Sequence, residues 1–201
     1  MSKLTHYMIH CTATPEGMEV TGDKLRQWHI GPARTAEGKL KYKGKIYDDV
    51  FALPDDKIGG IHINQLVGGR GWRQVGYADL IRLDDKIENL VPYDEDDNVD
   101  SLELTNGILA SSELYSGTRH IVYAGGMDTA FKKPKDTRTT SQITHMTMKV
   151  FETISYHPDI VILGHNQVDP RACPSFNVPD WLTSIGVADK NISKLPLKYQ
   201  L

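Results

Sequence analysis

Short apolar runs, separated by polar and glycine-rich stretches, form the main pattern of this chain. Runs of this kind, rich in β-branched and aromatic side chains, are typical of buried strands. They predict strands of a common core at Tyr7–Ile9, Val75–Leu83, His120–Ala124 and Val161–Leu163.

Two other stretches have the periodicity of a helix. Between Lys24 and His29 the apolar side chains are three residues apart, and Thr21 or Asp23 can cap this helix. A longer helix is predicted to start at a Thr140 or Ser141 cap and to run to about Tyr156, where His157-Pro158 ends it. One face of that helix carries Ile143, Met146, Val150 and Ile154.

The middle of the chain is less regular. Residues 31–70 are rich in Gly and Lys, and the pieces Leu40–Tyr42, Ile46–Phe51 and Ile61–Leu66 favour hairpin-like strands. Residues 84–100 are acidic and are predicted to form a surface loop. Because strands alternate with helices, we expect an α/β fold: a single domain with a mixed central β-sheet flanked by helices on both faces.

Composition narrows the possible functions. The chain has 201 residues and a formal net charge of −3, so nothing in its charge indicates a general binder of nucleic acid or of anionic membranes. It shows neither a membrane-spanning run nor a signal peptide, so we expect synthesis in the cytoplasm and no membrane insertion. The two cysteines, Cys11 and Cys173, form no disulfide framework. Cys11 is interpreted as a buried free thiol, with a Cys11–Cys173 disulfide as the alternative.

One loop carries most of the candidate chemistry. The segment from Gly164 to Phe176 follows an apolar run and places His165 and Cys173 eight residues apart. Imidazole and thiolate are ligands that zinc prefers. His10, at the end of the first apolar run, is the candidate third ligand, because neighbouring strands of one sheet can bring it to the same point. Three protein ligands with a fourth position open are typical of a catalytic zinc ion.

Several motifs, in order along the chain, resemble the zinc-dependent N-acetylmuramoyl-L-alanine amidases of the phage-lysozyme type, which are related to the animal peptidoglycan recognition proteins. The motifs are Ile9-His10-Cys11-Thr12-Ala13, Arg26-Gln27-Trp28-His29, Gly71-Trp72 with Val75-Gly76-Tyr77, Ile121 to Gly126, and Gly164 to Phe176. By this resemblance His10, His165 and Cys173 are the ligands of a single catalytic Zn²⁺. It also implies that Tyr77 lies near the reacting water and that Arg171 stands where the phage enzymes have a catalytic lysine.

The implied reaction is hydrolysis of the amide between N-acetylmuramic acid and the L-alanine of the peptidoglycan stem peptide. Arginine does not readily lose its proton, so Arg171 is interpreted as an electrostatic clamp on the oxyanion. The resemblance also implies insertions at about 31–70 and 84–118. Ala78 and Leu109 differ from the family where a substrate-side polar residue is common.

We therefore expect a monomeric peptidoglycan amidase, in particular a phage endolysin that waits in the host cytoplasm and acts on the cell wall once released. Three alternatives stay open: a cytosolic amidase that recycles muropeptides, a non-catalytic peptidoglycan-binding module, and a zinc-stabilised interaction domain. The run Asp94-x-Asp96-x-Asn98-x-Asp100 resembles the start of a calcium loop. It has Val99 and Thr105 where that loop needs Gly and Glu, so a solvated loop is favoured.

Overall fold

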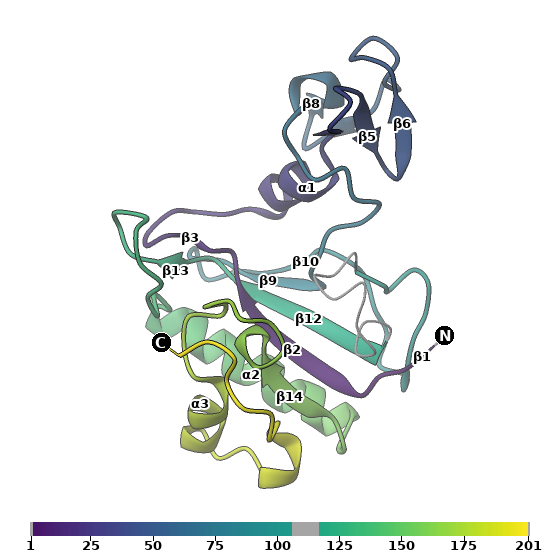
Figure 1. The fold of residues 1–201 in the computed structure, drawn as a ribbon. Helices are drawn as coiled ribbons and strands as arrows, with labels where there is room; N and C mark the ends of the chain where they lie inside the picture. The colour runs from purple at the N-terminus through teal and green to yellow at the C-terminus, as the bar shows by residue number, and fades with distance from the viewer. Residues whose placement is uncertain (1, 106–116, 201) are drawn as a thin grey trace.

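The computed structural model describes residues 2–105 and 117–200, and a five-stranded sheet forms the centre of this part (Figure 1). The strand order is β10 (Ile87–Asn89), β9 (Asp79–Ile81), β12 (Thr118–Tyr123), β2 (His6–Cys11) and β14 (Val161–Gly164). β9, β12, β2 and β14 pair in parallel, whereas β10 pairs antiparallel with β9. The mixed sheet predicted from the sequence is confirmed.

The register of the parallel strands decides where the functional residues meet. Ile9 of β2 pairs with Ile121 of β12 on one side and with Gly164 of β14 on the other. His10 therefore lies level with the end of β14, and His165 follows directly after it. Because the carboxyl ends of parallel strands share one edge of a sheet, the chemistry of the chain gathers there.

Helices cover both faces of the sheet, as predicted. On one face Leu25 of α1 (Gly22–Ile30) packs with Leu80 and Val122. On the other face α2 (Thr140–Tyr156) and α3 (Val178–Ser184) pack through Met146 and Trp181 against the side chains of β2 and β12. Figure 1 shows the sheet between α1 and the α2–α3 pair.

Both predicted helices start at a capping residue, but the predicted cap of α2 is wrong by one residue. Thr21 caps α1 by accepting a hydrogen bond from Lys24 N at 3.2 Å. The cap of α2 is Thr139, one residue before the predicted choices, because the capping box needs Gln142 three residues later. α3, capped by Asn177, is absent from the sequence prediction.

Residues 33–66 form a small lobe beside α1 (Figure 1). It contains the antiparallel strands β4 (Ala33–Arg34), β5 (Leu40–Tyr42) and β6 (Lys45–Tyr47), the hairpin β7 (Lys57–Ile58) and β8 (Ile61–His62), and the 3₁₀ turn η1 (Ile63–Gln65). Two predicted strands are too long: β6 stops at Tyr47, and the chain turns after His62. The turn lets Ile63 and Leu66, three residues apart, both reach the core of the lobe around Tyr42 and Ile58.

The acidic stretch is only partly a loop. A tight turn with Asp85 at φ 61° sends the chain back to form β10, so the loop prediction is wrong for Ile87–Asn89. Further on, β11 (Asn98–Val99) pairs with β1 (Ser2–Lys3), and carboxylates of the run accept backbone N–H groups within it. Residues 106–116 of the second expected insertion, including Leu109, lie outside the described residues.

The remaining elements are short. They are β3 (Thr14–Pro15), which pairs with β13 (Gly126–Met127), and the 3₁₀ turns η3 (His165–Gln167) and η4 (Asp189–Asn191). Within residues 2–105 and 117–200, no helix has the length and apolar character needed to cross a membrane.

Candidate metal centre

His10 is placed by the alternation of β2. Tyr7, Ile9 and Cys11 pack into the core on the α2–α3 side, so His10 points to the other face of the sheet. Its side chain is fully buried, and this burial holds the pKa of the imidazole well below its usual range. A neutral imidazole keeps a free lone pair, which is the form that binds a metal.

His165 and Cys173 are placed by the loop after β14. Gln167 accepts a hydrogen bond from Gly164 N at 2.9 Å, and Asn166 donates one to Phe176 O at 3.3 Å. The first of these hydrogen bonds lies at the start of the loop, and the second connects that start to the end of the loop at Phe176. Sγ of Cys173 then lies 3.3 Å from Cys11 N, which donates to it, and 3.6 Å from Nδ1 of His10.

The structure brings the three predicted ligands together. One donor atom from each of His10, His165 and Cys173 lies within 4.8 Å of the others, so the group can hold a metal ion. Both ring nitrogens of His165 are buried without a hydrogen-bond partner, which is costly unless something else binds them. Burial also lowers the pKa of His165 to about 4. Two neutral imidazoles and one thiol fit the donor preference of zinc.

His120 is a neighbour of this group that the sequence pattern did not indicate. It lies on β12, on the same face as His10, and its Nδ1 is 2.9 Å from Nε2 of His10. Burial lowers the pKa of His120 to about 3, so both rings are neutral. Because Nδ1 of His10 faces Cys173, a metal there leaves the proton of His10 on Nε2, from which it is donated to His120.

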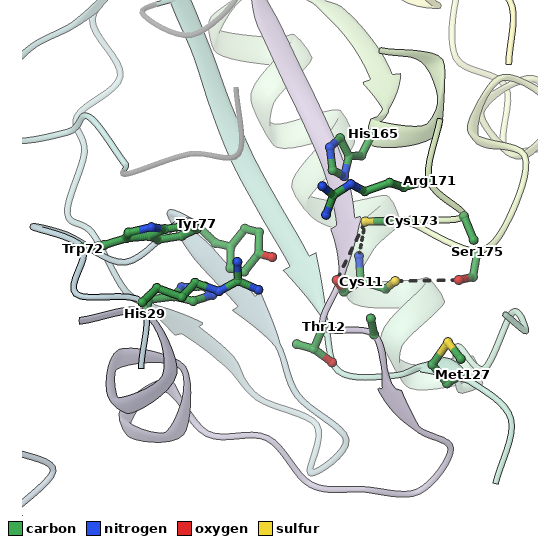
Figure 2. Close-up of a pocket in the computed structure, with 13 residues that line it drawn as sticks. Cys11, Thr12, His29, Trp72, Tyr77, Met127, His165, Arg171, Cys173 and Ser175 are labelled. Atoms are coloured by element: carbon green, nitrogen blue, oxygen red, sulfur yellow. Dashed lines mark hydrogen bonds between the residues drawn. The ribbon is translucent and has the colours of Figure 1, made fainter. Parts of the chain in front are cut away.

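A pocket of about 350 Å³ opens at His165 and Cys173, and we call it the metal pocket (Figure 2). Figure 2 shows His29, Trp72 and Tyr77 along one wall and His165, Arg171 and Cys173 along the opposite wall. The lining residues are Cys11, Thr12, Ala13, His29, Arg70, Trp72, Tyr77, Met127, His165, Arg171, Ala172, Cys173 and Ser175.

Tyr77 lines the same pocket. Its ring centroid is 5.2 Å from that of His10 and 5.4 Å from that of His29. Burial raises the pKa of the Tyr77 hydroxyl far above its usual range. The hydroxyl therefore keeps its proton at neutral pH and is available as a hydrogen-bond donor in the pocket.

Arg171 lines the same pocket but is less fixed than expected. Its side chain is 67% exposed, and its Nε donates to the Asp169 carboxylate at 3.3 Å. Water screens such a charge, so its effect on a reacting group grows only when a bound substrate excludes that water.

The wall opposite Arg171 is held by a stack that begins at α1. Nδ1 of His29 accepts the Gly76 N–H at 3.1 Å, and Trp72 packs on the His29 ring with centroids 4.8 Å apart. Arg70 lies over the Trp72 ring at 5.1 Å and brings a second cation to the pocket. Arg70 was not among the residues predicted from the sequence, although it directly precedes the Gly71-Trp72 motif.

Both cysteines are free thiols in the structure. Cys11 is buried in the core cluster on the far face of β2, as expected for a packing residue. Its Sγ lies 3.8 Å from Oγ of Ser175. Cys173 thus remains available to a metal.

Comparison with known proteins agrees with this architecture. No model of a known protein family matches the sequence. The endolysin of Enterobacteria phage K11 is 24% identical over 179 residues, covering 89% of this chain and 85% of that protein. The endolysin of Escherichia phage T7 is 25% identical over 132 residues, covering 64% of this chain and 77% of that protein.

Among solved structures, PGRP-SA of bumblebee is similar in fold. It has a TM-score of 0.54 at 13% identity, with 98% of this chain and 90% of that chain covered. The fold is thus that of the peptidoglycan recognition proteins. Together with the sequence similarity to endolysins, this fold supports the resemblance to the phage-lysozyme-type amidases and peptidoglycan recognition proteins that the motifs indicate.

Proposed function

We propose that this protein is a phage endolysin with zinc-dependent N-acetylmuramoyl-L-alanine amidase activity. The observation that carries the proposal is the group His10, His165 and Cys173, which offers three metal ligands. His165 and Cys173 line an open pocket, and His10 lies fully buried beside them. Three protein ligands in an accessible site are typical of catalytic zinc, whereas structural sites are usually closed by four. The similarity to proteins named endolysin supports the cell wall as the target.

Zinc, when bound to such a set, polarises a carbonyl oxygen and makes water acidic enough to attack near neutral pH. The chain's own groups then act on the substrate. Tyr77, protonated and buried, donates a hydrogen bond toward the oxygen on which negative charge develops. Arg171 attracts the same charge from the opposite wall; one such donor is typically worth about 3 kcal/mol.

Proton transfer is assigned to a group other than Arg171. A guanidinium stays protonated at any physiological pH, so Arg171 cannot supply the proton that the leaving amine needs. The attacking water loses a proton as it adds to the carbonyl, and that proton is available to the leaving amine. Tyr77 lines the pocket, keeps its own proton and donates a hydrogen bond. We further propose that the protein acts as a monomer, which light scattering of the purified protein will test.

The test uses isolated cell walls and the variant Cys173→Ser. We expect the wild-type protein to bind one zinc ion, to clear the walls and to release free L-alanine amino termini. Cys173→Ser removes the thiolate and should lose zinc and activity together, while keeping the wild-type circular dichroism spectrum. Cys11→Ser is the matched control, because it removes the other thiol of the pocket lining, which is not one of the three grouped donors; it should retain zinc.

The products separate the candidate functions. Zinc binding with new reducing sugar ends and no L-alanine amino termini would show cleavage of the glycan instead of the amide. Binding to walls with no cleavage would indicate a recognition module. Zinc binding with neither wall binding nor cleavage would indicate an interaction domain.

A further inference from the structure

An apolar groove lies next to the metal pocket. The two hollows share Thr12 and Ala13, in the connection between β2 and β3. The groove has a volume of about 390 Å³. The described residues that line it are Thr12, Ala13, Thr14, Pro15, Met18, Trp28 and Phe131, and none of them carries a charge.

Phe131 occupies an unfavourable backbone conformation at the rim of this groove. It closes the turn after β13, where its N–H donates to Asp128 O at 2.9 Å, and its φ is 56°. Glycine adopts this left-handed conformation without strain, whereas a residue with a bulky side chain does not. The aromatic side chain is also 60% exposed, so burial does not compensate for the strain. Strain kept at an exposed position beside a functional pocket indicates a role for the side chain.

Trp28 also lines the groove. It is partly buried against the core cluster on the α1 side of the sheet, and Nζ of Lys24 lies 5.6 Å from its ring. Met18, a third apolar side chain of the groove, is partly exposed. The groove therefore offers two aromatic rings and a thioether to any part of a bound substrate that extends from the metal pocket on this side.

The charges of the two hollows differ in a way that matches the proposed substrate. Arg70 and Arg171 are the charged residues among those that line the metal pocket, whereas the groove has none. On one side of the scissile amide the stem peptide carries free carboxylates. On the other side the N-acetylated sugars are neutral, and their C–H faces pack well on aromatic rings.

We propose that the groove is the glycan subsite, in which a neutral N-acetylated sugar packs on Phe131 and Trp28 while the stem peptide lies toward the arginines. This inference rests on the proposed amidase function. In this arrangement the sugar leaves the metal pocket past Thr12 and Ala13, and the peptide stays in the metal pocket, between the walls that carry Arg70 and Arg171.

Phe131→Gly tests the subsite, because it removes the ring and the strain together. We expect Tm to rise by about 2–4 °C, since the turn gains its preferred residue. On a disaccharide-peptide substrate KM should rise about tenfold with kcat changed less than twofold. On a lactyl-peptide that lacks the sugar both constants should equal those of the wild type. Phe131→Trp should keep the wild-type KM on both substrates.

Phe51→Gly is the matched control, because Phe51 is 93% exposed on the lobe and lines neither the metal pocket nor the apolar groove. It should leave KM unchanged on both substrates. The subsite is refuted if Phe131→Gly hydrolyses the disaccharide-peptide like the wild type, or loses activity equally on both substrates. A wild-type protein that releases no L-alanine amino termini contradicts the amidase function itself, so the two failures are distinguishable.

Discussion

At the scale of single residues, the candidate ligands were accessible from the sequence and their supporting partners were not. His165 and Cys173 share one loop, so their spacing in the sequence indicates them. His10 follows an apolar run, and the end of a predicted strand indicates it as the third ligand. His120 gives no such signal. Its proximity to His10 depends on the parallel register of β12 with β2, which places His120 two positions diagonal to His10 on the same face.

His120 should fix the orientation of His10 toward the metal. His120→Leu removes the acceptor for the Nε2 proton of His10, and we expect the dissociation constant for zinc to rise about 10–100-fold. His120→Asn places an amide oxygen near the position of Nδ1 and should restore most of the affinity. Competition with a chromophoric chelator measures both values. Equal affinities for the Leu and Asn variants would show that only packing matters at this position.

At the scale of elements, the strands and helices of the core were largely predictable, and the errors have local causes. The strand expected over Val75–Leu83 is too long at both ends, since β9 spans only Asp79–Ile81. Before β9, the Gly76 N–H is bonded to the His29 side chain instead of a neighbouring strand. Asn177 with Pro179 is a helix-start signal for α3 that apolar periodicity does not reveal. The start of β9 and the presence of α3 therefore depend on a side-chain contact and a helix cap, which apolar periodicity does not reveal.

The connection between the lobe and the metal pocket depends on Gly71. Its φ is 63°, its N–H donates to Gly31 O at 2.8 Å, and an added Cβ would lie only 2.3 Å from Lys41 O. Gly71→Ala should therefore lower the free energy of unfolding by more than about 1 kcal/mol and displace the adjacent Arg70 and Trp72. We expect reduced hydrolysis with unchanged zinc content.

Gly60→Ala in the same lobe is the matched control. Gly60 also has a positive φ, 79°, but no atom lies within 4 Å of its added Cβ. It should show the cost of backbone strain alone, with activity unchanged. If the two variants lose equal stability in chemical denaturation and equal activity, the close approach at Gly71 does not position the pocket.

At the scale of the whole molecule, the candidate site lies between two parts of the chain that are distant in sequence. The sheet edge supplies the candidate ligands, and the chain that returns from the lobe supplies Arg70 and Trp72. Apolar patterning predicted the sheet and its edge, because burial fixes which face each strand presents. The pocket wall that contains Arg70 and Trp72 was not predictable, since its position depends on backbone hydrogen bonds such as the one from Arg70 N to Trp28 O.

His29, which lines the metal pocket, makes the stability of the metal-free protein depend on pH. Burial, with a smaller effect from the Arg70 charge, lowers the pKa of His29 to about 4, against 6.5 for an unperturbed histidine. Between these values the unfolded chain binds a proton that the folded protein does not, so stability is lost as pH falls from about 6.5 toward 4. For one such histidine the free energy of unfolding falls by up to about 1.4 kcal/mol per pH unit.

The variant His29→Asn isolates this contribution. Asn can accept the Gly76 N–H in place of Nδ1 but does not titrate, so its unfolding free energy should fall less steeply between pH 6.5 and 4.5. Urea denaturation in the presence of a chelator, at half-unit steps of pH, gives both slopes. The wild type should be steeper by up to about 1.4 kcal/mol per unit in this window, and the slopes should converge above pH 7. Parallel curves throughout would mean that His29 is already protonated in the folded protein, and that the stack it forms with Trp72 and Tyr77 tolerates the charge.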